Sequence, residues 1–222
     1  MNTTVIYYTA NRITDFFHIN IRRKLLDLCD GIPIISVSHK PIDLGFNICV
    51  GDIGCSAYNV YKQILIGAKE AKTKYVACCE DDCLYNREHL TFEPEEYAFY
   101  YNHSRWMLEG DGRFRYRHRT GMHTCIVQTE LMIKTLEIRF NKYPIPLFER
   151  NSLKGWGEPG RYEKNLRLPP VRMESFTTVD PVITFNHKPC LGGLRRTAPT
   201  DIIKTELEPW GNAKKLWDDI HG

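Results

Sequence analysis

Three consecutive carboxylates, Glu80, Asp81 and Asp82, are the residues of this sequence best suited to bind a cation. Adjacent carboxylates repel one another unless a cation or hydrogen-bond donors lie among them. Hard oxygen ligands of this kind suit Mg²⁺ or Mn²⁺, and such an ion can also hold the two phosphates of a nucleotide. The alternative is a solvated turn, in which Asp is a common residue. Taken alone, the triplet leaves both interpretations open.

The elements around the triplet place it at a functional edge. It follows residues 75–79, a short apolar run of the kind that forms a buried strand. Runs at 4–9 and 34–38 predict two earlier strands, and apolar residues at helical spacing predict helices over 14–28 and 57–73. This alternation is typical of a parallel sheet with crossover helices. Ligands bind beyond the carboxyl ends of such strands, which is where the triplet lies.

The whole chain of 222 residues is expected to form one α/β domain, with a mostly parallel central sheet flanked by helices. The second half is less regular, and it contains most of the proline, glycine and aromatic clusters. We therefore expect an irregular C-terminal half that determines specificity, because loops on an α/β scaffold usually carry function.

The composition is ordinary for a soluble globular protein, with 42% hydrophobic and 26% charged residues. A net charge of +3 and an isoelectric point of about 8.4 fit a polyanionic partner without requiring one. Residues 1–5 lack the basic start and the long apolar stretch of a signal peptide. No window approaches the ~20 apolar residues of a membrane span, so we expect no stable membrane association.

Eight cysteines could indicate a disulfide framework, but three of them crowd into residues 78–83, where adjacent pairing is awkward. No C-x-x-C pair occurs. Reduced thiols in a cytoplasmic protein, in the host cytoplasm if the protein is viral, are the simpler interpretation. A zinc site would need ligands scattered through the chain, and we do not expect one.

The segment 54–59, Gly-Cys-Ser-Ala-Tyr-Asn, opens the second predicted helix, and the next strand runs into the acidic triplet. This arrangement resembles the glycosyltransferases of the GT-A fold, in particular the large inverting family 2. There a small-residue segment ending in Asn begins a helix, and the next strand leads to a D-x-D-type motif. The resemblance extends from Val5 through the triplet and, more thinly, to about Arg196. It implies a Rossmann-like GT-A fold and a nucleotide-sugar donor, with a family-level preference for uracil.

Carried over to this chain, the resemblance gives residues 1–100 to the donor and 101–222 to the acceptor. It implies that Asp82 binds the Mn²⁺ or Mg²⁺ ion directly, and that its two neighbours reach ribose or a metal-bound water. Residues 9–12 would contact base and ribose. Asp52 is a plausible partner of uracil or ribose, although its glycine neighbours would also make an ordinary turn. The implied donor-binding residues are Thr9, Ala10, Asn11, Arg12, Asp52, Asn59, Glu80 and Asp81.

The general base of an inverting transferase has two candidates, Glu158 and Glu163. The segment 155–166 resembles the glycine-tryptophan segment and following acidic pair of many inverting members. The family's pair is usually Glu-Asp, whereas here Pro159 follows Glu158. Glu158 matches by its position after Gly-Trp-Gly, and Glu163 by its place three residues before Leu166. Either one could instead cap a helix, whose N-terminus favours negative charge.

A late histidine would complete the metal shell in this family. His187 ends an apolar run and lies 29 residues after Glu158, a spacing similar to that in several members. A glycine pair then precedes Arg195 and Arg196, which could close over the diphosphate as bidentate donors.

The acceptor is less defined by the sequence. Residues 113–119 alternate basic and aromatic side chains, so in a strand the four arginines would share one face. That face could follow phosphates, or it could be the solvated face of an edge strand. Small GT-A proteins of this kind include bacteriophage enzymes that glycosylate hydroxymethylated pyrimidines in DNA. That acceptor is our first expectation, while a sugar, glycan or protein acceptor is equally permitted and the oligomeric state is undefined.

Two other functions compete with a metal-dependent inverting glycosyltransferase. A nucleotidyltransferase would need a glycine-rich phosphate loop after the first strand, and residues 9–13 contain no glycine. A non-catalytic nucleic-acid-binding module would use the arginines alone, and it predicts neither nucleotide-sugar binding nor metal dependence.

Overall fold

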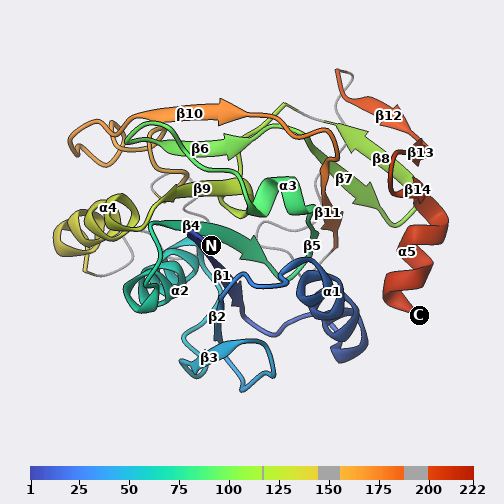
Figure 1. Cartoon of the computed structure of the whole chain (residues 1–222), viewed down its shortest axis with the longest axis horizontal. Coiled ribbons are helices and arrows are strands. Elements are labelled where there is room, and N and C mark those ends of the chain that lie inside the picture. The colour runs from blue at the N-terminus through green and yellow to red at the C-terminus, as the bar shows by residue number, and fades with distance from the viewer. Residues whose placement is uncertain (117, 145–155, 188–199) are drawn as a thin grey trace.

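Parallel strands form the centre of the fold in the computed structural model (Figure 1). The structure describes residues 1–116, 118–144, 156–187 and 200–222. Strand β1 (Thr3–Thr9) pairs in parallel with β2 (Ile34–Ser38) on one side and with β4 (Tyr75–Glu80) on the other. The three strands predicted from the sequence are confirmed, and β4 ends at the first carboxylate of the triplet.

A seven-stranded sheet grows from this centre in the order β10-β6-β9-β4-β1-β2-β3. Strand β3 (Phe46–Cys49) extends the parallel part beyond β2. On the other side β9 (Cys125–Gln128) runs antiparallel between β4 and β6 (Phe99–Asn102). Strand β10 (Met173–Phe176) then pairs in parallel with β6. The predicted fold class, with a mostly parallel central sheet flanked by helices, is confirmed.

Helices cover both faces of this sheet. Helix α2 (Ala57–Glu70) and helix α4 (Thr129–Lys142) pack on the face that carries Ile6. Helix α1 (Asp15–Leu28) packs on the other face, which carries Val5. Helix α2 approaches β1 so closely that a side chain at Gly67 would come within 2.7 Å of the Ile6 methyl carbon. The glycine therefore fixes the depth at which α2 lies on the sheet.

The second half contains more regular structure than the sequence indicated. A five-stranded sheet has the order β12-β8-β7-β11-β5, and β11 pairs in parallel with β7 but antiparallel with β5. Its strands are short and lack long apolar runs, and apart from the neighbouring strands β7 and β8 they pair with partners distant in the sequence. They are β5 (Cys83–Leu84), β7 (Arg105–Glu109), β8 (Arg113–Tyr116), β11 (Val182–Asn186) and β12 (Ile202–Lys204).

The remaining elements are short. They are α3 (Arg87–Leu90), the 3-10 turn η1 (Met122–Thr124), the pair β13 (Glu206–Leu207) and β14 (Gly211–Asn212), and α5 (Ala213–His221). Helix α5, at the C-terminus in Figure 1, packs against α1 and β7. Within the described ranges, no helix has both the length and the apolar character needed to cross a membrane.

The alternating arginines do not form a solvated stripe. Strand β8 lies between β7 and β12, so it is not an edge strand. Arg115 is fully buried and forms ion pairs with Glu109 and, at 3.3 Å, with Asp201. Arg113 is exposed and pairs with Asp111. The expectation of one basic face was wrong for Arg115, because the neighbouring strands bring carboxylates over it. Arg117 lies outside the described residues.

Candidate active site

A pocket of about 650 Å³ opens where the carboxyl ends of β1 and β4 meet the N-terminus of α2. The position follows from the topology, because parallel strands end at a common edge and their connecting loops surround it. Most of the residues that the sequence assigned to the donor line this pocket. They are Thr9, Ala10, Arg12, Asn59, Glu80 and Asp81, together with Asp82.

Asp81 is held in place from two sides. Its carboxylate accepts a hydrogen bond from the Thr9 hydroxyl, and Nε2 of His18 lies 3.2 Å from the same oxygen. Thr9 also accepts a bond from the backbone N–H of Asn11 at 2.8 Å. Asn11 has a positive φ of 52°, and its side chain accepts from the N–H of Lys40 at 2.9 Å. Asn11 therefore shapes the turn after β1 and does not itself line the pocket.

The loop before α2 forms the opposite rim. Asn59 donates to the carbonyls of Ile53 and, at 2.9 Å, of Gly54, so it fastens this loop to the helix. The side chain of Asp52 is 90% exposed, lies 3.6 Å from His39, and accepts from the N–H of Gly54 at 2.9 Å. The pocket lining does not include Asp52, and its bonding here is that of a turn residue.

A second, larger pocket of about 1320 Å³ adjoins the first. The two share Val60, Glu80 and Asp82, so they form one cleft with two carboxylates at the junction. The second pocket is bounded by β7, by η1 and by the segment that begins at Trp156. A ligand bound in one pocket would therefore meet a ligand bound in the other beside Glu80 and Asp82.

The two candidate bases occupy different environments. Glu158 lines the second pocket, and its side chain is 19% exposed, with Arg161 at 3.9 Å. Glu163 is buried outside the cleft, where its carboxylate accepts from Arg139 and from the N–H of Gly160 at 2.5 Å. Of the two candidates, Glu158 therefore lines the cleft, whereas Glu163 is ion-paired outside it.

His187 lies on the side of β11 that carries Phe185. Its ring contacts Phe17 at 4.7 Å and Trp217 at 5.7 Å, and Nε2 of His221 lies 3.4 Å from its Nδ1. Burial, reinforced by His221, lowers the pKa of His187 to about 4. The residue is not part of the lining of either pocket, so the structure does not place it with Asp82 at the junction. Arg195 and Arg196 lie outside the described residues.

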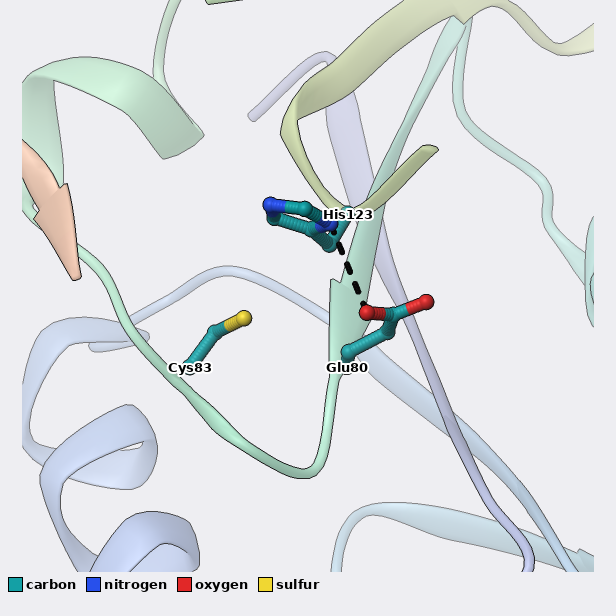
Figure 2. A group of neighbouring side chains, drawn as sticks. All are labelled: Glu80, Cys83 and His123. Atoms are coloured by element: carbon teal, nitrogen blue, oxygen red, sulfur yellow. Dashed lines mark ion pairs between the residues drawn. The ribbon is translucent and has the colours of Figure 1, made fainter. Parts of the chain in front are cut away.

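A different group of side chains does meet at the junction. The ligand atoms of Glu80, Cys83 and His123 all lie within 4.8 Å of one another (Figure 2). Glu80 is the last residue of β4 and Cys83 is the first residue of β5, whereas His123 belongs to η1. The sequence offered no signal for His123, because no spacing connects it to the triplet. Cys83 follows Asp82 directly and could have been considered as a ligand from the start.

One solved structure has the same fold, and a second is similar below that level. A glycosyltransferase involved in the glycosylation of the major capsid of PBCV-1 matches with a TM-score of 0.50 and 10% sequence identity, over 83% of this chain and 93% of that one. TarS (residues 1–349) from S. aureus, in complex with UDP-GlcNAc, matches with a TM-score of 0.49 and 13% identity, over 90% of this chain and 62% of that one. No family model and no curated protein matches. The chain thus has the fold of the PBCV-1 glycosyltransferase.

Proposed function

We propose that this chain is a metal-dependent, inverting glycosyltransferase that uses a nucleotide-sugar, with UDP-sugar as the expected donor. The observation that carries the proposal is the pair Glu80 and Asp82 at the junction of two adjoining pockets in a glycosyltransferase fold. One pocket would hold the donor and the other the acceptor. The reacting sugar would then lie at the carboxylates that both pockets share.

The donor pocket has the groups that a nucleoside diphosphate requires. Residues 9–12 lie at the carboxyl end of β1, where a contact with base and ribose is expected, and Arg12 lines the donor pocket. A diphosphate beside Glu80 and Asp82 would be repelled without a cation, and carboxylate oxygens are suitable ligands for one. When bound, the cation would neutralise charge on the departing nucleoside diphosphate. Asp81, which contacts Thr9 and His18, is proposed to reach ribose rather than the ion.

Glu158 is the proposed general base. It lines the acceptor pocket, so its carboxylate can take the proton from an acceptor hydroxyl bound there. A base on the acceptor side, with the nucleotide on the other, supports attack from the face opposite the leaving group and inversion at the anomeric carbon. Glu158 follows Gly157, whose carbonyl accepts a hydrogen bond from Arg139 at 2.8 Å. That bond fixes the segment on which the base is carried.

Three arginines line the acceptor pocket together with the carboxylates of Glu80, Asp82 and Glu158, and they are the groups that would bind an acceptor with negative charge. Arg105 is buried, Arg119 lies in the lining, and the side chain of Arg161 is 52% exposed at the rim. Guanidinium groups bind phosphate and carboxylate in a planar, bidentate manner. A hydroxymethylated pyrimidine flanked by DNA phosphates fits this lining, and it is the acceptor that we propose.

The seven described cysteines are all free thiols, which is compatible with the proposed cytoplasmic location.

Calorimetry tests the donor first. UDP should bind in the presence of Mn²⁺, and a screen of nucleotide-sugars should reveal slow, Mn²⁺-dependent donor hydrolysis. Hydroxymethylated DNA and unmodified DNA are then each incubated with the enzyme and the intact form of the donor that the screen identifies. Mass spectrometry detects the transferred sugar. Absence of UDP binding with the metal present would overturn the whole proposal. Sugar transfer to a glycan but not to DNA would overturn the acceptor alone.

A further inference from the structure

We propose that Glu80, Cys83 and His123 form a binding site for a thiophilic divalent cation such as Zn²⁺, on the floor of the cleft. The role of this ion in the transfer reaction rests on the proposed function. As a binding site it stands on geometry alone. Carboxylate oxygens by themselves would favour Mg²⁺ or Mn²⁺, whereas a cysteine sulfur and an imidazole favour zinc-like ions. The inference therefore revises the identity of the ion expected from the acidic triplet.

The distances between the candidate ligands suit a tetrahedral ion. Nδ1 of His123 lies 3.4 Å from Oε2 of Glu80, as the dashed line in Figure 2 shows. The Cys83 thiol donates a hydrogen bond to Oδ1 of Asp82 at 3.2 Å, so this carboxylate lies beside the group without belonging to it. Zinc binds nitrogen and oxygen at about 2.0–2.2 Å and sulfur at about 2.3 Å. Tetrahedral ligands at those lengths are themselves about 3.3–3.8 Å apart. The Glu80–His123 pair already has this spacing, and the Cys83 sulfur, within 4.8 Å of both, would move closer on binding.

Further contacts hold two of the ligands in the orientation that an ion requires. Nε2 of His123 lies 3.2 Å from the Thr184 hydroxyl, and a proton on Nε2 would make Nδ1, which lies 3.4 Å from Oε2 of Glu80, the nitrogen that faces a cation. Oε1 of Glu80 accepts from the Tyr8 hydroxyl at 3.1 Å, while Oε2 faces the histidine. Metal-binding histidines and carboxylates are commonly oriented by such outer hydrogen bonds.

The fold explains how distant residues meet. Antiparallel pairing of β5 with β11 places Cys83 opposite Thr184. The turn η1 contacts β4 and brings His123 over Glu80. A side chain on Gly121 would lie 2.5 Å from the His123 ring, so the glycine leaves the space that the ring occupies.

Burial indicates that the site is closed on one side and open on the other. Cys83 is 1% exposed and His123 is 6% exposed, so little water would compete with these two ligands for an ion. Glu80 and Asp82 line both pockets, so the remaining side faces the cleft. Zinc sites that act in catalysis keep such an open position for a substrate oxygen. Binding would release the Cys83 proton to solvent, since the thiolate is the ligand.

Cobalt is a suitable probe, because Co²⁺ occupies zinc sites and a thiolate bound to it gives a charge-transfer absorption band. The reduced wild-type protein should bind about one equivalent of Co²⁺ with this band, and Zn²⁺ should displace it. Cys83→Ser should lose the band. Cys49→Ser, at an exposed cysteine on β3, is the matched control and should keep it. Circular dichroism and thermal unfolding verify that both variants are folded.

Thr184→Val provides a second test that leaves all the ligands in place. It should keep the band but weaken Co²⁺ binding about tenfold, because outer-shell partners contribute about 10–100-fold to metal affinity. A wild-type protein that binds no Co²⁺, or binds it without the thiolate band, would overturn the inference. UDP binding is measured on the same samples, both with Mn²⁺ and with Zn²⁺. A protein that binds UDP but shows no thiolate band contradicts the zinc-type site alone, and the reverse result contradicts the proposed transferase alone.

Discussion

Arg139 and Glu163 form a buried ion pair, in which Nε of the arginine lies 2.9 Å from Oε1 of the glutamate. The same guanidinium donates through Nη1 to the carbonyl of Gly157 at 2.8 Å. The carboxylate closes the turn by accepting from the N–H of Gly160 at 2.5 Å. One arginine on α4 thereby holds both ends of the segment that carries Glu158. The second acidic residue of this segment positions the first.

Glu158→Gln should lower kcat by about 100- to 10,000-fold, because it removes the proposed base while keeping the shape of the side chain. UDP affinity should stay within twofold of the wild-type value, since Glu158 lines only the acceptor pocket. Steady-state transfer rates and calorimetry measure the two quantities. Asp52→Asn, at an exposed carboxylate outside the cleft, is the control and should change neither. Full activity of the Gln variant would exclude Glu158 as the base.

Glu163→Gln should destabilise the fold by about 3–5 kcal/mol, because it leaves the buried Arg139 charge without its partner. Urea unfolding followed by circular dichroism measures this change. Combining it with Arg139→Met should recover part of the loss, since the double variant leaves no buried charge unpaired. A stability equal to the wild type in the single variant would contradict a structural role for Glu163.

Asp82→Asn should reduce transfer by about 100-fold or more, since an amide supplies less charge to a cation at the junction. The affinity for UDP measured with Mn²⁺ should fall, whereas the affinity measured in a chelator should not. Calorimetry under both conditions provides the comparison. Normal turnover and normal metal-dependent UDP binding in this variant would contradict a cation at the junction.

His89 gives the fold a defined sensitivity to acid. Burial, followed by the influence of His123, lowers the pKa of His89 from its ordinary value of 6.5 to about 3. The unfolded chain binds this proton below about pH 6.5 and the folded chain does not, so the stability contribution is complete above that pH. This contribution is lost as the pH falls from 6.5 towards 3, and the loss is about 2 kcal/mol at pH 5.

His89→Phe should remove that part of the acid sensitivity while retaining a ring between Tyr85 and Phe176. The measurement is the free energy of unfolding in urea at pH 7 and pH 5, in a chelator. The difference between the two pH values should be about 2 kcal/mol smaller in the variant than in the wild type. An unchanged difference would show that another group dominates acid unfolding.

Arg161→Ala should raise the KM for an anionic acceptor several-fold at low salt, and the effect should shrink at high salt because the exposed charge is screened. Arg172→Ala is a matched control, since the side chains are 52% and 54% exposed and Arg172 lies outside the acceptor pocket. An equal effect of both variants would indicate general charge rather than a contact in the pocket.

The first half of the fold was predictable because its signals are local. The strands at 4–9, 34–38 and 75–79 are continuous apolar runs, and α1 and α2 have apolar residues at helical spacing. Their alternation then determines where the acidic triplet lies. The pocket at this edge follows directly, which is why most of the expected donor residues line it.

The rest of the site depends on contacts that no local pattern encodes. Arg115 looked solvated in the sequence and is buried, because Asp201 reaches it from a distant segment. Glu163 matched a family position, yet it forms an ion pair with Arg139 outside the cleft. His123 carried no motif at all, and only the turn before β9 brings it to Glu80. Side chains that meet through tertiary pairing require the structure.

The pairing of β5 with β11 has a consequence for the order of folding. It joins Cys83 to Thr184 across about half of the chain, and β11 also pairs with β7, another strand far away in the sequence. Closing so long a loop costs chain entropy before any contact can offset that cost, so such pairings form slowly. The N-terminal layers can assemble as they emerge during synthesis, whereas the cleft waits for residues 182–186. The cleft would therefore be completed only after the N-terminal layers have formed.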